Sequence, residues 1–124
     1  MVQSLNTKVD FVIKGTAFMG LSEYGEIMIG DQAFEFYHKT DNRKYIQIPW
    51  EEVDCVIASV LFKGRWIPRY SIKTKRNGTF TFASKEPKKV LRAIRVYIEG
   101  SKMVRSLGFF GVLKRALTKK KSKT

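Results

Sequence analysis

The first 84 residues alternate between short strand-like runs and turn signals, and this rhythm restricts the chain to a small antiparallel β architecture. Asn77-Gly78 is the clearest turn, because both residue types tolerate the positive φ of a type I′ hairpin. Seven runs have the β-branched, aromatic or alternating character of strands: 9–18, 25–29, 34–37, 45–48, 55–62, 66–75 and 79–83. Within them, the apolar run 55–62 predicts a central strand, and Pro68 predicts an edge position or a bulge.

The pattern changes to a helical period after residue 84. Ser84 is a suitable N-cap, Pro87 fits the first turn, and Gly100 suits the end of this helix. A second helix is predicted over 101–121, where apolar side chains cover one face and basic side chains the other. Earlier in the chain, residues 50–53 suit a single helical turn after Pro49.

Seven strands followed by one amphipathic helix predict a mainly β (α+β) domain. The helix plugs the open end of a strongly bent seven-stranded antiparallel sheet or open barrel. This arrangement resembles the PH-like superfold and its GRAM-like relatives; an OB-fold or another small barrel is the alternative. We expect a PH-like domain over residues 1–100 and a basic amphipathic helix with its tail over 101–124.

The net charge of +13 is divided unevenly along the chain. Residues 1–60 carry 5 basic and 9 acidic groups, whereas residues 61–124 carry 19 basic and 2 acidic groups. The alternative is that the lysines only keep a small protein soluble, but solubility alone does not require such segregation. The asymmetry favours an anionic partner: nucleic acid, an anionic lipid surface or an acidic protein face.

The sequence carries no pattern typical of an active site, so we expect a binding module and no enzyme. Cys55 is the single cysteine and His38 the single histidine, and no cluster has metal-ligand spacing. No phosphate-binding glycine motif is present, and no cofactor is expected. The single cysteine and the lack of an apolar run long enough to span a bilayer predict a cytoplasmic protein, peripheral on the inner face of the cell membrane.

Two segments are candidates for contact with an anionic surface. The first is the predicted second helix, whose apolar face can lie in the headgroup plane or pack on the sheet. Its candidate residues are Arg105, Phe109, Phe110, Leu113, Lys114, Arg115, Leu117, Lys119, Lys120 and Lys121. The second is a basic-aromatic patch around a turn, formed by Lys63, Arg65, Trp66 and Arg69. For Trp66 the alternative is ordinary packing in the sheet.

Nucleic acid is the competing partner. The charge alone predicts salt-dependent, non-specific binding of nucleic acid. The predicted helices form no helix-turn-helix, and no aromatic RNA-binding motif is present, so sequence-specific recognition has little support in the chain.

Six segments together resemble the small ManO family of Firmicutes. They are VQSLNTKVD (2–10), FMGL (18–21), IMIGD (27–31), FEFY (34–37), RKYIQIPWEEV (43–53) and PKKVLRAIR (87–95). Members of that family are encoded beside the genes of mannose-class sugar phosphotransferase systems and are regarded as regulators of that operon. The resemblance transfers no catalytic residue to this chain.

The resemblance implies a non-enzymatic accessory or regulatory protein of such a transport system. Combined with the basic amphipathic segment, it predicts docking on the cytoplasmic face of the mannose-class permease subunits. A DNA-binding regulator of the mannose operon and a lipid-surface binding module are the alternatives.

Overall fold

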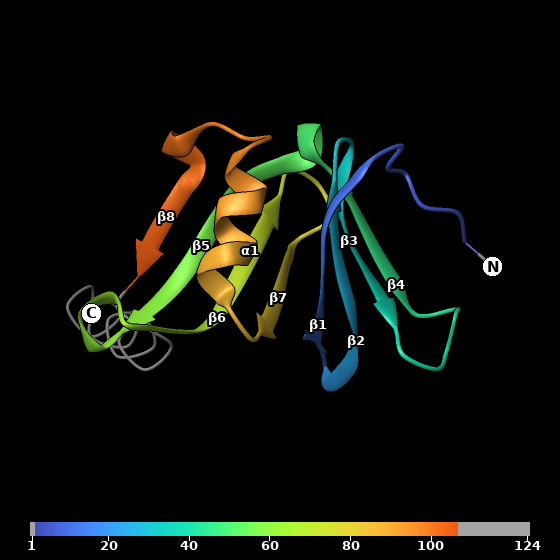
Figure 1. The fold of residues 1–124 in the computed structure, drawn as a ribbon, viewed down its shortest axis with the longest axis horizontal. Helices are drawn as coiled ribbons and strands as arrows, with labels where there is room; N and C mark the ends of the chain where they lie inside the picture. The colour runs from blue at the N-terminus through green and yellow to red at the C-terminus, as the bar shows by residue number, and fades with distance from the viewer. Residues whose placement is uncertain (1, 107–124) are drawn as a thin grey trace, which may run out of the picture.

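The structure is a computed structural model, and it describes residues 2–106. Over this range it forms eight β-strands, one α-helix and three short 3₁₀ turns (Figure 1). The strands are β1 (Val9–Met19), β2 (Leu21–Gly30), β3 (Ala33–His38), β4 (Tyr45–Pro49), β5 (Val53–Leu61), β6 (Trp66–Thr74), β7 (Thr79–Ser84) and β8 (Met103–Ser106). Helix α1 covers Pro87–Arg95, and the 3₁₀ turns η1, η2 and η3 cover Trp50–Glu52, Phe62–Gly64 and Gly100–Lys102.

All eight strands belong to one mixed sheet with the order β4-β3-β2-β1-β7-β6-β5-β8. Every neighbouring pair is antiparallel except β5 and β8, which run parallel. The sheet is open, with β4 and β8 at its two edges. In Figure 1, strands β1–β4 form one half, and α1 lies in front of the strands of the other half. A mainly β fold with one helix against the sheet is confirmed.

The core lies between the two halves of the sheet and is closed by α1. Phe82 on β7 is at its centre, with ring centroids 4.8 Å from Phe34 and 6.4 Å from Tyr70. Helix α1 contributes Val90 and Ile94, which are fully buried. The helix is amphipathic, and burial of its apolar side against the strands stabilises it, since nine residues are too few for an isolated helix.

A pair of glycines on β1 and β2 lies where neighbouring groups approach the backbone closely. Gly15 and Gly25 face each other in the register of the two strands. A Cβ atom on Gly25 would lie 2.0 Å from the carbonyl oxygen of Tyr37, and one on Gly15 would lie 2.4 Å from Cδ1 of Ile27. At Gly25 the backbone of β3 therefore excludes a side chain, whereas at Gly15 the Ile27 side chain would have to move.

Residues 4–8 lie against β3 and the turn before it, and we call this segment the N-terminal strap. Glu35 on β3 is fully buried and accepts hydrogen bonds from Ser4 Oγ (2.6 Å), the Leu5 amide (2.7 Å) and Asn6 Nδ2 (2.9 Å). In the turn, Asp31 accepts hydrogen bonds from the Thr7 hydroxyl and the Lys8 amide, and these hold its pKa at about 2. The strap is thus fixed to the sheet by two carboxylates.

The C-terminal end of the described chain differs from the expectation. Residues 101–106 form a 3₁₀ turn and strand β8, so the prediction of a helix from residue 101 is wrong for these six residues. The remainder of that helix, 107–121, lies outside the described residues. The sheet therefore continues beyond the domain boundary expected at residue 100 and has eight strands, one of them parallel, in place of seven antiparallel ones. Sheet pairing of β8 with β5 prevails over local helical periodicity here.

Three smaller differences also have local causes. Helix α1 ends at Arg95, five residues before Gly100, because Tyr97 turns away to stack on Trp50 at 5.4 Å. Gly78 has positive φ, but Asn77 does not, since the Thr74 hydroxyl accepts a hydrogen bond from its amide in a wider turn. Strand β5 lies next to the edge of the sheet, not at its centre. The ladder between β5 and β6 is irregular beside Pro68, as the bulge prediction requires.

Candidate docking surface for an anionic partner

The turn between β5 and β6 has an unusual backbone. Phe62, Lys63 and Gly64 follow one another with φ values of 51°, 56° and 90°, all in the left-handed region. Glycine adopts this region freely, but each of the two other residues costs roughly 1–2 kcal/mol there. Non-glycine residues in the left-handed region concentrate at functional positions, where the surrounding structure maintains them. Two such residues in succession make this turn a candidate binding site.

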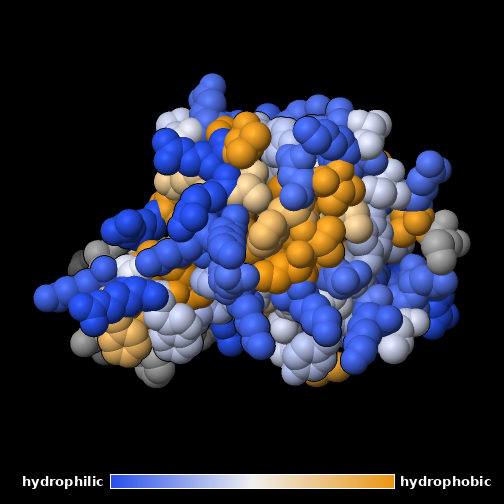
Figure 2. All heavy atoms as spheres, in the orientation of Figure 1, coloured by the Kyte–Doolittle hydropathy of each residue, from blue (hydrophilic) through white to orange (hydrophobic). Residues whose placement is uncertain are grey.

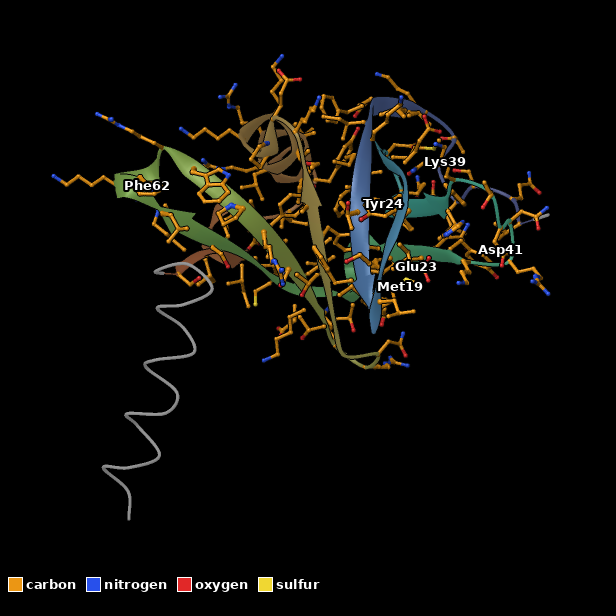
Figure 3. All side chains as sticks on the ribbon, turned by 90° about the horizontal axis from the view of Figure 1, so that it is seen from below. Met19, Glu23, Tyr24, Lys39, Asp41 and Phe62 are labelled. Atoms are coloured by element: carbon orange, nitrogen blue, oxygen red, sulfur yellow. The ribbon has the colours of Figure 1, made fainter. Side chains whose placement is uncertain are left out.

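The same turn exposes two aromatic rings. Phe62 is 69% exposed and Trp66 is 51% exposed, and their rings stack with centroids 6.1 Å apart and an angle of 16°. Figure 3 shows Phe62 at the outer end of the turn, far from the labelled residues Met19, Glu23 and Tyr24 of β1 and β2. We call this stacked pair with its turn the aromatic tip. Two large apolar rings held together in water form a surface that a partner can cover.

Basic side chains accompany the aromatic tip. Lys63 and Arg65 are exposed within the turn itself. Arg69 lies further along β6, where its guanidinium is 4.2 Å from the ring centroid of Phe18. Arg105 is exposed on β8 and pairs in register with Ala58 of β5. Strand β8 ends at Ser106, which pairs with Ser59, three residues before Phe62.

A larger basic surface extends over α1. Its exposed side presents Lys88, Lys89, Arg92 and Arg95, and among these only Lys89 has an ion pair in the described part of the chain, with Glu86 at 2.9 Å. Residues 61–106 contain 13 basic and 2 acidic residues in total. Figure 2 shows hydrophilic side chains gathered over α1 and toward the β5–β6 turn. We call the exposed side of α1 the basic face.

The structure thus places the predicted site residues in three groups. Lys63, Arg65 and Trp66 come together at the aromatic tip, whereas Arg69 lies on β6 and Arg105 on β8, the two strands that flank β5. The other predicted residues lie outside the described part of the chain: Phe109, Phe110, Leu113, Lys114, Arg115, Leu117, Lys119, Lys120 and Lys121. Phe62 was not among the predicted site residues. Its position directly before the Lys63-Gly64 turn is the sequence signal that identifies it.

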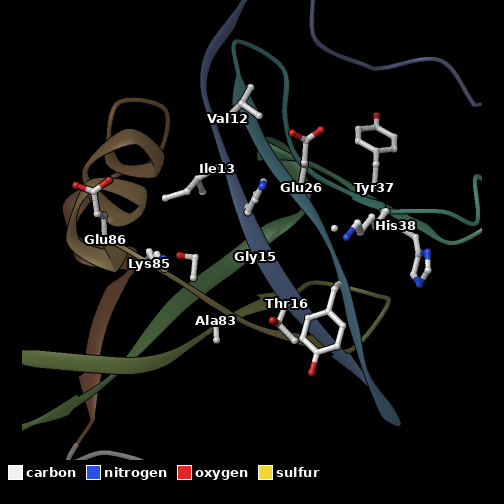
Figure 4. A pocket seen from close by; sticks show the side chains of 15 residues that line it. Val12, Ile13, Gly15, Thr16, Glu26, Tyr37, His38, Ala83, Lys85 and Glu86 are labelled. Carbon is white, nitrogen blue, oxygen red and sulfur yellow. The ribbon is translucent and has the colours of Figure 1, made fainter.

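A hollow with a volume of about 1050 Å³ lies along strands β1 and β2 (Figure 4). Its floor includes the Gly15–Gly25 pair, and one wall is formed by residues 83–86. Three lysines and two glutamates line it, so its charges nearly balance: Lys14, Lys39, Lys85, Glu26 and Glu86. The positive charge of the chain is therefore concentrated elsewhere, on the basic face and around the aromatic tip.

His38 at the end of β3 belongs to a hydrogen-bonded cluster. Its Nε2 lies 2.9 Å from Glu23 Oε2, and its Nδ1 accepts hydrogen bonds from the Thr40 and Asp41 amides. Glu23 also binds Lys44 at 2.9 Å, and this contact lowers the pKa of the carboxyl. Within residues 2–106, no group of three His, Cys, Asp or Glu residues is arranged to hold a metal ion. The arrangement orders the turn after β3.

Comparisons with known proteins give the fold and the family. No curated protein matches the chain. The crystal structure of the C-terminal domain of an unknown protein from Leishmania infantum is similar, with a TM-score of 0.63 and 14% sequence identity over 72% of this chain and 82% of that chain. At this identity the likeness shows the fold alone. Among the described residues, no helix is long and apolar enough to cross a bilayer. A family model described as "Domain of unknown function (DUF956)" matches residues 1–117, and the chain belongs to this family.

Proposed function

We propose that this chain is a non-enzymatic accessory protein of a mannose-class sugar phosphotransferase system, which docks on the cytoplasmic face of the membrane permease subunits. The observation that carries the proposal is the segregation of charge, with 13 basic and 2 acidic residues between 61 and 106. The choice of partner comes from the resemblance of six sequence segments to the ManO family.

The proposed fold is PH-like, a class that serves mainly as a scaffold for binding. Seven strands in the order β4-β3-β2-β1-β7-β6-β5, followed by α1, support this assignment. In this proposal the fold supplies a rigid support, and function depends on what its surface presents. Its basic face and aromatic tip are the surfaces with chemistry suited to an anionic partner.

The basic face accounts for attraction to the membrane region. Each lysine or arginine near an anionic leaflet contributes about 1 kcal/mol, and the effect fades within a Debye length of about 8 Å at physiological ionic strength. Four exposed basic residues on α1 therefore give binding that is substantial but reversible. Acidic side chains on the cytoplasmic loops of a permease would add the specific contacts.

The test is retrieval of the permease subunits from detergent-solubilised membranes by the tagged full chain. A double charge reversal on α1, Lys88→Glu with Arg92→Glu, should abolish retrieval. The matched control is Lys14→Glu with Lys39→Glu, which makes the same change of charge on the other half of the molecule and should retain it. Retrieval by neither the wild type nor the control, or equal retrieval by all three proteins, would contradict the proposal.

A truncated chain then locates the contact more closely. The cut belongs after Ser106, not after Gly100, because the shorter chain would lose β8 and expose the edge of β5. If truncation after Ser106 abolishes retrieval while the α1 reversal does not, the last 18 residues carry the docking and the basic face does not. If retrieval fails throughout but the promoter of the operon is bound specifically at physiological salt, the DNA-binding alternative is correct.

A further inference from the structure

We propose that the aromatic tip inserts Phe62 and Trp66 into the headgroup region of an anionic bilayer, as a lipid contact separate from docking on protein. The inference rests on the proposed function, since it names the lipid partner of a protein that works at the membrane. It assigns insertion to the folded sheet and does not require the C-terminal segment.

The exposed rings supply the apolar part of the argument. Phe62 and Trp66 stack on each other outside the core, and neither ring joins the buried cluster. A tryptophan combines an apolar ring with a polar N–H group, and for this reason it prefers the boundary between headgroups and acyl chains. Covering the pair with lipid removes both rings from water while the indole N–H keeps a polar environment.

The backbone supplies the second part. Three successive left-handed residues reverse the chain within the turn and hold Phe62 outward. Glycine or asparagine at positions 62 and 63 would adopt this conformation with less strain than a bulky residue. The chain nevertheless has phenylalanine and lysine there, one apolar and one cationic. Those are the two side-chain types that an insertion into an anionic membrane uses.

Charge distinguishes this tip from the other exposed apolar turn of the molecule. Leu21 at the β1–β2 turn is 77% exposed and Met19 is 38% exposed. The first charged residue after that turn is Glu23, whereas Lys63 and Arg65 lie within the β5–β6 turn. Exposure is thus similar at the two turns, but basic residues that complement an anionic leaflet lie within the turn itself only at the aromatic tip.

The experiment measures binding of the full chain to vesicles of phosphatidylcholine with about 30% phosphatidylglycerol, by sedimentation at physiological salt. The double substitution Phe62→Ala with Trp66→Ala should lower the partition coefficient about tenfold or more, consistent with loss of two buried rings. The control, Met19→Ala with Leu21→Ala at the other turn, should change it less than twofold. Thermal unfolding by circular dichroism verifies that both variants fold.

Fluorescence gives an independent measure of insertion. Trp50 is 9% exposed, so Trp66 is the residue whose emission should shift to the blue and be quenched by brominated lipid. The Trp66→Phe variant should lose both signals and retain most of the binding. Equal partition of the tip variant and the control, or no quenching of Trp66 in bound protein, would overturn the proposal.

The two proposals can fail separately, because permease retrieval takes place in detergent without a bilayer. A tip variant that still retrieves permease but fails on vesicles supports both proposals. If wild type fails to retrieve permease yet binds vesicles through the tip, only the permease proposal fails. Binding that the tip substitutions leave intact but truncation after Ser106 abolishes assigns the lipid contact to the C-terminal segment and rejects the tip.

Discussion

The buried carboxylate of Glu35 offers the most exact test of how the N-terminal strap is held. Replacement by glutamine retains the shape of the side chain but exchanges one acceptor oxygen for an NH₂ group. Oε1 accepts from Ser4 Oγ and Asn6 Nδ2, and Oε2 accepts from the Leu5 amide and, at 3.3 Å, from Gln47 Nε2. The Ser4 hydroxyl can rotate to accept, but the other three are donors only. In either orientation, the new NH₂ group therefore faces at least one N–H donor, and neither of the two groups has an acceptor there.

The expected cost follows from these contacts. A buried polar group left without its partner costs about 1–3 kcal/mol, and hydrogen bonds to a charged acceptor contribute more than those to a neutral one. We therefore expect Glu35→Gln to lower the free energy of unfolding by about 2–4 kcal/mol. With the urea dependence usual for small domains, the midpoint should fall by about 1–2 M.

Urea unfolding followed by tryptophan fluorescence gives the first measure, and hydrogen exchange of the Leu5 amide gives the second. The matched control is Glu26→Gln on β2, an exposed glutamate whose side chain has no hydrogen bond or ion pair among those described. It should unfold like the wild type. If Glu35→Gln and the control have the same midpoint and the Leu5 amide stays protected, the carboxylate does not hold the strap and the reasoning is refuted.

Three further predictions concern the β5–β6 turn, the glycine on β2 and the N-terminal strap. Lys63→Gly should raise the free energy of unfolding by about 1 kcal/mol in thermal or urea unfolding, because glycine adopts φ near 56° without strain. Gly25→Ala should lower it by about 2–3 kcal/mol, because the new Cβ would meet the Tyr37 carbonyl oxygen at 2.0 Å, and backbone must move. The pKa of Asp31 is about 2 in the folded chain, below its ordinary value of 3.8, so its carboxylate stabilises the docked strap above pH 4. That contribution should disappear as the pH falls from about 4 to about 2, observed as a loss of protection of the Thr7 amide relative to its intrinsic exchange rate, and Asp31→Asn should remove this pH dependence.

The strands could be predicted because their signal is local. Alternation of buried and exposed side chains, as in Tyr45–Pro49, is determined by residues next to one another, and the turn types between the runs set their limits. The end of α1 is different. The apolar residues after Arg95 continue the helical period, but Tyr97 stacks on Trp50 from a turn, a contact with a residue 47 positions earlier. Periodicity cannot distinguish these two ways of burying the same ring.

The candidate site was predicted in part for the same reason. Lys63, Arg65 and Trp66 stand out in the sequence, since basic and aromatic residues alternate around a glycine. The role of Phe62 depends on backbone angles that composition does not encode. The strap was not predicted, because the Ser4–Lys8 segment reads as an ordinary polar loop until Glu35 is seen to be buried beneath it.

Strand β8 also has a consequence for the order in which the molecule folds. It pairs with β5 in parallel, joining Met103 to Val56 across 47 positions of the chain, whereas the hairpins β1–β2 and β6–β7 close over a few residues. Contacts between distant positions of a chain form slowly. During synthesis, the outer side of β5 has no partner until residue 106 has been made. Until then the molecule has an uncovered strand that a second nascent chain can pair with. By pairing with residues 56–59 of β5, the four-residue strand β8 leaves a shorter uncovered edge for such pairing.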